Sequence, residues 1–330
     1  MKMRYFCVCL CVMWQLLGPA YAANPRYASI VVDVQTGRVL HQISSQERIY
    51  PASLTKMMTL YLVFDALHRG QLRLNQKIPI SRWAAQQEPS SLGLKPGDWI
   101  TVEKAILSLV CRSANDIAVA LAEAVGGSER RFARLMTARA WSLGLKRTSF
   151  HNATGLFHPK QMTTAHDMAR LGIFLVKHFP KEYAYFKRRK FSFRGKIHKS
   201  HNKLVGNVHG VDGLKTGYIR KAGFNLVTSA KRKQKRLMAV VIGGKTAKWR
   251  DQRMVSLLEM GFRHANLNQK SLKRMPNWQQ GPFLQSASLG KPVKPKRRRP
   301  KKQMRSVRFL KTRRAMVAKA RTVDDLLTAS

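Results

Sequence analysis

Cysteine and acidic residues are both scarce in this 330-residue chain, and each shortage excludes a class of protein. Only four cysteines are present, and Cys7, Cys9 and Cys11 all lie in the first apolar segment. Removal of that segment leaves Cys111 alone, which excludes an intrachain disulfide and a lipid anchor on a cysteine. Aspartate and glutamate number 16 against 62 lysines and arginines, a formal net charge of +46. Such a basic chain binds polyanions of some kind.

Several catalytic and membrane patterns are also missing. No H-E-x-x-H pattern is present, so His198, His201 and His209 are interpreted as surface residues of a basic loop, and we expect no metal or cofactor. No G-x-S-x-G elbow is present, which argues against a Ser-His-Asp hydrolase. The apolar run over residues 5–17 is too short to span a membrane comfortably.

The two ends of the chain differ in composition from the rest. Residues 1–22 have a basic start, an apolar run and an A-x-A site, which is typical of a signal peptide. We therefore expect export to the periplasm and an anionic membrane surface or wall polymer as the partner, with no nucleic acid. Residues 265–303 are predicted to form a basic, proline-rich linker. Residues 304–330 fit either an amphipathic helix on an anionic membrane or a disordered basic tail.

Residues 23–264 have the pattern of one catalytic α+β domain. The first two strand-like runs form a predicted hairpin that feeds into an apolar helix ending at Gly70. A helical block, three strand-like runs and a closing helix follow. This order predicts an antiparallel sheet that joins the two ends of the domain, flanked by helices. The predicted strands are 27–34, 38–43, 211–218, 223–231 and 237–243, and the predicted helices are 57–69, 102–111, 116–125, 128–143, 166–177 and 250–264. Residues 71–100 are expected to be loop-rich, and residues 181–203 to be irregular and basic.

The first catalytic candidate is the stretch P-A-S-L-T-K over residues 51–56, where a loop passes into the apolar helix. Residues i and i+3 share a helix face, so the amine of Lys56 can reach the hydroxyl of Ser53. A lysine accepts a serine proton at neutral pH only if burial or a second cation lowers its pKa. The apolar helix offers the burial, and Lys215 is the candidate second cation. Alone, the tetrapeptide is weak evidence, because such a serine is more often a helix cap.

Two further motifs follow along the chain. Ser113-Ala114-Asn115 lies at a break between two predicted helices, where a hydroxyl and an amide can point into a cleft. The later Lys215-Thr216-Gly217 lies on a predicted strand, where a lysine and a threonine can bind a carboxylate and a glycine leaves room for a substrate. Each motif alone is more simply a helix cap or a strand end. The ordered set S-x-x-K, S-x-N and K-T-G is far rarer by chance, and it indicates acyl transfer by an activated serine.

This ordered set resembles the motifs of low-molecular-mass penicillin-binding proteins, the D-alanyl-D-alanine carboxypeptidases of serine peptidase family S11. The similarity covers about Tyr27 to Arg263 and includes four further blocks, at residues 152–156, 162–165, 223–227 and 243–246. The resemblance implies a β-lactamase/transpeptidase-like fold. It also implies removal of the terminal D-alanine from peptidoglycan pentapeptides through an acyl-enzyme, with β-lactams as inhibitors.

The resemblance assigns catalytic roles to four residues. Ser53 would be the nucleophile and Lys56 its proton acceptor. Ser113 would pass a proton to the leaving amine. The backbone N–H groups of Ser53 and Tyr218 would hold the oxyanion.

Substrate binding is implied for five others. Asn115 would orient the substrate backbone. Lys215 and Thr216 would bind the terminal carboxylate, with Arg250 assisting. Gly217 would leave space for the substrate against the strand.

Two alternatives were weighed against this prediction. A class A-like β-lactamase needs a glutamate for deacylation between the second and third motifs, and residues 130–166 contain no aspartate or glutamate. A catalytically idle wall-binding module would not need every motif side chain intact. The carboxypeptidase is therefore preferred.

Overall fold

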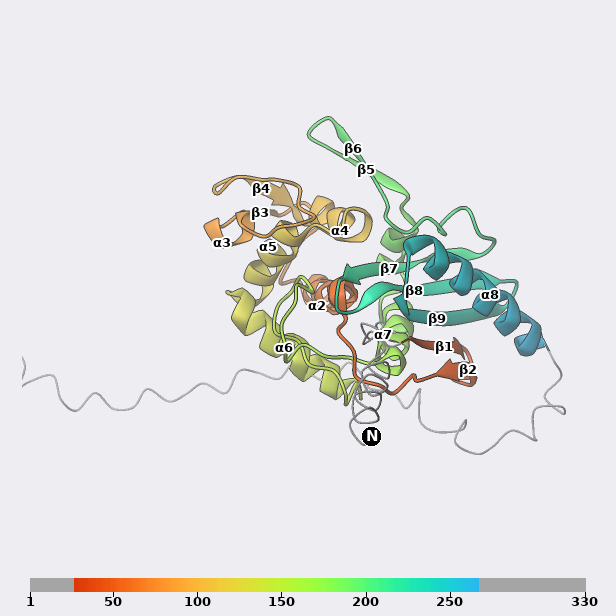
Figure 1. Ribbon diagram of the computed structural model, residues 1–330. Helices are drawn as coiled ribbons and strands as arrows, with labels where there is room; N and C mark the ends of the chain where they lie inside the picture. Colours follow the sequence, from red (N-terminus) through yellow and green to blue (C-terminus); the bar gives the residue numbers. More distant parts are fainter. Residues whose placement is uncertain (1–26, 267–330) are drawn as a thin grey trace, which may run out of the picture. The chain divides into compact units, whose positions relative to one another are not determined.

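The computed structural model describes residues 27–266, in which an antiparallel sheet carries helices on both faces (Figure 1). The predicted α+β fold is confirmed. The predicted signal peptide, nearly all of the predicted linker and the predicted tail helix lie outside the described residues. Each helix within residues 27–266 is too short or too polar to cross a membrane.

Five strands make up the main sheet, and every neighbouring pair in it is antiparallel. In spatial order they are β2 (Val39–Ile43), β1 (Ala28–Asp33), β9 (Lys235–Gly244), β8 (Gly223–Arg232) and β7 (Val211–Ile219). The first hairpin of the chain thus pairs with its last strand, as the order of the predicted elements requires. The order leaves β7, which carries the K-T-G motif, at one edge of the sheet.

The central strands are apolar because both faces of the sheet are covered. In β9, Met238 and Val240 belong to the core shared with the helices of one face, whereas Ala239 and Val241 pack with the closing helix α8 (Ala247–Asn266) on the other. Successive strand side chains point to opposite faces, so a strand buried on both sides becomes a continuous hydrophobic run. This explains the run L-M-A-V-V-I in β9.

The helix after the serine motif lies at the centre of the larger core. It is α2 (Lys56–His68), preceded by one turn of 3-10 helix, η1 (Ala52–Thr55). Every residue from Lys56 to Ala66 is buried, which confirms the predicted buried helix and places a lysine in an apolar environment. The helices around it are α4 (Val102–Cys111), α5 (Asn115–Gly126), α6 (Glu129–Ser142) and α7 (Ala165–His178).

Two stretches contain more structure than the sequence predicts. The expected loop over residues 71–100 forms a small sheet and a short helix, namely β3 (Lys77–Pro79), α3 (Arg82–Ala85) and β4 (Trp99–Thr101). The section expected to be irregular forms η2 (Glu182–Lys187) and a hairpin of β5 (Lys190–Phe193) and β6 (Lys196–Lys199). Phe191 packs into the core, and Arg194 and Gly195 supply the two positive φ angles of a tight hairpin turn. The expectation of an irregular section is therefore wrong.

Candidate active site

Ser53 lies on η1, at the point where the edge of the sheet meets the buried helix α2. Gly217 of β7 lies against this turn: a Cβ atom added there would be 3.1 Å from the backbone nitrogen of Ser53 and 3.2 Å from that of Leu54. The absence of a side chain therefore lets the strand approach the serine closely. Ala52, just before the serine, has a φ of 48°, which is sparsely populated for a residue with a side chain. Such strained backbone is common next to catalytic groups.

Lys56 is fully buried, and its amine has three oxygen neighbours. Its Nζ atom lies 3.3 Å from Ser53 Oγ, 2.7 Å from Asn115 Oδ1 and 2.6 Å from the carbonyl oxygen of Thr154. The amide and the carbonyl oxygens can only accept hydrogen bonds. In the neutral amine, these two acceptors take both N–H groups, which leaves the nitrogen lone pair for the Ser53 hydroxyl. The geometry thus suits removal of a proton from that hydroxyl.

Asn115 is held in the orientation that this arrangement needs. Its Nδ2 donates to the carbonyl oxygen of Pro89 at 2.5 Å, so its Oδ1 faces Lys56. Its backbone N–H donates to the carbonyl oxygen of Ser90 at 2.7 Å. The predicted contact between Asn115 and a substrate stays a prediction, and the observed contact is with the lysine.

Burial lowers the pKa of Lys56 well below its usual value, and the positive charge of Lys215 lowers it further. These are the two causes expected from the sequence. The carboxylate of Asp116 acts in the opposite direction and raises the pKa. That carboxylate accepts hydrogen bonds from the backbone N–H groups of Leu92 and Gly93 and thereby fixes the loop beside the helix junction.

Ser113 lines the same cleft with a strained backbone and an unpartnered hydroxyl. Its φ is 60°, and its Oγ atom is buried without a hydrogen-bond partner among the described residues. A buried hydroxyl without a partner is costly unless a ligand supplies one. The geometry is therefore compatible with the predicted proton transfer, which stays a prediction.

The third motif brings a buried cation to the cleft. Burial, followed by the positive charge of Arg250, lowers the pKa of Lys215 to about 7. Its Nζ donates to the carbonyl oxygen of Thr216 at 2.9 Å, and no carboxylate pairs with it within residues 27–266. The buried guanidinium of Arg250 is held by Asp251, at 2.9 Å from Nε and 2.7 Å from Nη2. A bound carboxylate would supply the anion that Lys215 lacks.

These groups line one cleft of about 810 Å³. The predicted site residues that line it are Ser53, Ser113, Asn115, Thr216, Gly217, Tyr218 and Arg250. Lys56 and Lys215 are buried behind this surface, where Lys56 contacts Ser53 and Lys215 contacts Thr216. The structure therefore gathers all nine predicted residues around the cleft, although they come from distant parts of the sequence. Their chemical roles stay predictions.

Two features of the cleft do not follow from the sequence. The carbonyl oxygen of Thr154 is a direct partner of Lys56, and no side-chain pattern predicts a backbone carbonyl. Its neighbour Gly155 packs on the serine turn, because a Cβ atom there would lie 1.9 Å from the carbonyl oxygen of Ala52. His201 is exposed in a loop, as the sequence predicts, and it also lines the cleft, which the sequence does not predict. Its pKa is lowered to about 4, first by desolvation and then by Lys215 and other cations, so the imidazole is neutral.

Cys111, the one cysteine among the described residues, is a packed thiol at the end of α4. Its Sγ donates to the carbonyl oxygen of Arg188 at 3.5 Å. Burial raises its pKa to about 11, so the unreactive thiol form dominates at neutral pH.

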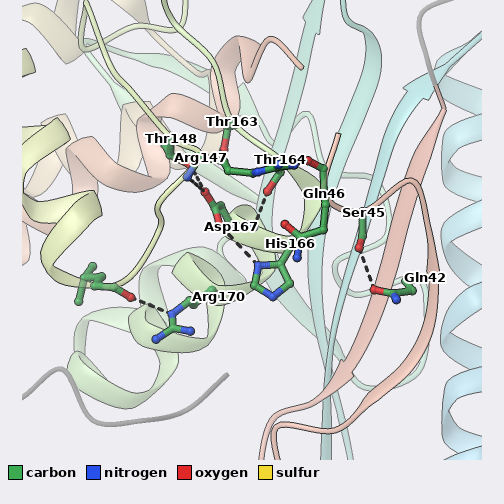
Figure 2. A network of polar contacts seen from close by, with 11 residues as sticks. Gln42, Ser45, Gln46, Arg147, Thr148, Thr163, Thr164, His166, Asp167 and Arg170 are labelled. Atoms are coloured by element: carbon green, nitrogen blue, oxygen red, sulfur yellow. Dashed lines mark hydrogen bonds and ion pairs between the residues drawn. The ribbon is translucent and has the colours of Figure 1, made fainter. Parts of the chain in front are cut away.

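A polar network holds the segment that leads into the serine turn (Figure 2). The Oδ2 atom of Asp167 accepts from Thr148 Oγ1 at 2.6 Å and from the backbone N–H of Arg147 at 3.1 Å. Thr148 also contacts the hydroxyl of Thr163 at 2.9 Å. The backbone of Thr163 exchanges two hydrogen bonds of 2.8 Å with Ile49, just before the turn. The network therefore ties the start of α7 to the chain that presents Ser53.

The fold and the clustered motifs define the class of the protein, a transpeptidase-like α+β domain with a serine-lysine centre. Residues 21–246 match the sequence model of the D-alanyl-D-alanine carboxypeptidase family, Peptidase S11. The chain belongs to this family.

Named relatives agree with this assignment. The chain is 39% identical over 243 residues to D-alanyl-D-alanine carboxypeptidase DacC of Escherichia coli K12, which covers 72% of this chain but only 61% of that relative. Penicillin binding protein 5 from Haemophilus influenzae matches with a TM-score of 0.69 and 34% identity, over 72% of this chain and 70% of that one. Penicillin-binding protein D2 from Listeria monocytogenes, solved in a cefotaxime-bound form, matches with a TM-score of 0.65 and 29% identity, over 71% of this chain and 96% of that one.

Proposed function

We propose that this protein is a serine-type carboxypeptidase that removes the terminal D-alanine from peptidoglycan stem peptides ending in D-Ala-D-Ala. The observation that carries the proposal is the buried amine of Lys56, whose two acceptor partners leave its lone pair for Ser53. The family supplies the substrate class, because the relatives are named D-alanyl-D-alanine carboxypeptidases.

The reaction has two steps. The Oγ atom of Ser53 attacks the carbonyl carbon between the two D-alanines while its proton passes to Lys56. The oxyanion is held by the backbone N–H groups of Ser53 and Tyr218. As the C–N bond breaks, Ser113 gives its proton to the leaving amine and takes up the proton that Lys56 carries, and D-alanine departs. Water then hydrolyses the ester on Ser53 and restores the hydroxyl.

The terminal carboxylate of the peptide binds at the cationic end of the cleft. Lys215 offers a buried ammonium group, Thr216 a hydroxyl, and Arg250 a second positive charge. Asn115 keeps Lys56 in position and orients the peptide. A bound carboxylate also raises the pKa of Lys215, so the substrate itself stabilises the charged form of its binding group.

A β-lactam acylates the same serine and leaves slowly. Asp251 is the one acidic residue in the cleft lining, and it is bound to Arg250. No carboxylate of the described cleft is therefore free to activate a deacylating water. This argues against the β-lactamase alternative, and the lowered pKa of Lys56 beside a serine argues against an idle binding module.

The compartment is part of the proposal. A signal peptide over residues 1–22 would direct the protein to the periplasm, where its substrate is located. The basic tail would add contact with an anionic membrane surface. Deletion of residues 291–330 should then weaken binding to anionic vesicles in a salt-dependent way while hydrolysis of a soluble peptide continues. Unchanged vesicle binding would remove the membrane role from the proposal.

Mass spectrometry of a pentapeptide digest tests the reaction directly. We expect loss of one alanine with the wild-type protein and no loss with Ser53→Ala. Labelling with fluorescent penicillin separates the alternatives: a stable adduct supports the carboxypeptidase, rapid release supports a β-lactamase, and no adduct supports a binding module.

A further inference from the structure

The cleft contains more positive charge than the terminal carboxylate needs. Lys203, Arg220 and Lys248 also line it, and all three are exposed. None of their side chains forms an ion pair or hydrogen bond within residues 27–266. Asp251, the acidic residue of the lining, already accepts hydrogen bonds from Arg250. These cations are therefore available to anionic groups of a ligand.

Arg220 directly follows the end of β7 at Ile219, which distinguishes it from the other two. Gly217 marks the level of Ser53, because a Cβ atom on it would contact the backbone of that serine. Lys215 precedes this point on the edge strand and Arg220 follows it. At roughly 3.3 Å per residue, the backbones of Lys215 and Ile219 each lie about 7 Å from the serine level, on opposite sides of it, and Arg220 comes one residue beyond Ile219.

This order fixes the direction of a bound peptide. A substrate with its terminal carboxylate at Lys215 and its scissile carbonyl at Ser53 runs antiparallel to β7, as an added edge strand does. Its upstream residues then extend past Tyr218 toward Arg220. The residue immediately before the D-Ala-D-Ala pair is the one whose side chain comes within reach of this arginine.

The walls at this end of the cleft are apolar. Leu156, Tyr218 and Ile219 line it, and the Tyr218 side chain is 53% exposed. The neighbouring cation Lys221 lies over the ring of Phe157, with its Nζ 4.2 Å from the ring centroid, and so has an aromatic partner. An apolar wall that ends at a guanidinium without a partner fits a chain of methylene groups ending in a carboxylate, which arginine binds with two parallel hydrogen bonds.

We propose that Arg220 is a specificity residue that selects peptides in which a long aliphatic side chain ending in a carboxylate immediately precedes D-Ala-D-Ala. This inference rests on the proposed carboxypeptidase function, because that function sets the direction of the peptide in the cleft.

Two soluble peptides of nearly equal size test the inference. Acetyl-L-aminoadipyl-D-Ala-D-Ala carries the carboxylate, and diacetyl-L-lysyl-D-Ala-D-Ala carries a neutral amide instead. We expect the wild-type protein to favour the acidic peptide by about fivefold in kcat/KM, and this ratio to fall with added salt. The ratio should approach one in Arg220→Gln. A third peptide, acetyl-L-lysyl-D-Ala-D-Ala, has a side chain that ends in a free amine. Arg220→Glu should hydrolyse this basic peptide in preference to the acidic one.

Lys248→Gln is the matched control, because it removes the same charge from the lining of the same cleft at a residue on α8. The ratio between acidic and neutral peptides should persist in this variant. An equal loss of the ratio in Lys248→Gln and Arg220→Gln would mean that the general field of the cleft attracts the carboxylate, and would overturn the inference. Equal wild-type rates for both peptides would also overturn it while leaving the carboxypeptidase intact. Failure to hydrolyse either peptide would contradict the proposed function itself.

Discussion

The amine of Lys56 lies closer to Asn115 than to the serine it is proposed to activate, with Nζ 2.7 Å from Asn115 Oδ1 and 3.3 Å from Ser53 Oγ. The shorter contact is to a group that can only accept, so a lysine hydrogen points at the amide. The amide thereby directs the lone pair of the neutral amine toward the serine. It does so without adding a negative charge that would keep the lysine protonated.

Asn115→Asp tests this relationship. The new carboxylate would lie in contact with Lys56 and raise its pKa, so the amine would stay protonated to higher pH. In the pH profile of the acylation rate, we expect the acid limb to move to higher pH by about one unit or more. The acylation rate at neutral pH should fall roughly tenfold. The measurement is the rate of labelling by a fluorescent penicillin as a function of pH.

Asp116→Asn should shift the pKa of Lys56 in the opposite direction, because the carboxylate of Asp116 raises that pKa in the native protein. Its removal should move the same limb to lower pH. If both variants shift the limb in one direction, the limb belongs to a group other than Lys56.

Lys56→Arg should remove most of the acylation, although it places a positive charge at the same position. A guanidinium stays protonated in proteins and cannot accept the serine proton. We expect the penicillin labelling rate to fall by about a thousandfold, the upper part of the range for loss of a general base. Lys231→Arg, an exposed position on β8, should label at the wild-type rate. Retained labelling in Lys56→Arg would show that the lysine acts only as a charge.

Lys215→Arg separates carboxylate binding from serine activation. The pKa of Lys215 is about 7, so the free protein loses this charge as the pH rises through 7. We expect the KM for a D-Ala-D-Ala peptide to increase above that pH, whereas kcat changes less because bound carboxylate raises the pKa. An arginine stays charged, so the alkaline increase in KM should disappear even if the rate is lower. Kinetics between about pH 6 and pH 9 decide this, and the same increase in both proteins would assign it to another group.

Sequence reasoning succeeded where the determining interactions are local or uniform. The facing of Ser53 and Lys56 follows from helical spacing, and the burial of α2 follows from its continuous apolar run. Strands β1 and β9 can be predicted from their apolar runs, because a sheet buried on both faces produces long apolar segments.

Sequence reasoning failed where the interacting partner is a backbone atom, and where a strand or hairpin is rich in charged residues. The Thr154 carbonyl carries no side-chain signature, so its contact with Lys56 was not predicted. The β5–β6 hairpin was missed because its basic residues face solvent, and the alternating Phe191 and Phe193 were the available signal. His201 is the exposed loop residue that the sequence predicts, but composition does not show that this part of the loop lines the cleft.

Gly155 offers the sharpest steric prediction, because its neighbour is the backbone that presents the serine. Its φ is 87°, and a Cβ atom would lie 1.9 Å from the carbonyl oxygen of Ala52 and 2.9 Å from the nitrogen of Ser53. Gly155→Ala must therefore displace either the serine turn or the loop that carries the Thr154 carbonyl. We expect unfolding to become easier by about 2–4 kcal/mol, measured by urea denaturation, together with at least a roughly tenfold loss of penicillin acylation.

Gly195→Ala separates the steric contact from the backbone penalty. Gly195 has a φ of 75° at the tip of the β5–β6 hairpin, with nothing within 4 Å of an added Cβ atom. This variant has the same conformational cost, about 1 kcal/mol, without the collision. Its acylation rate should equal that of the wild-type protein, because the hairpin tip does not line the cleft. If both alanine variants lose the same stability and retain acylation, the close contact at Ala52 does not hold the serine turn, and the role given to the Gly155 loop is wrong.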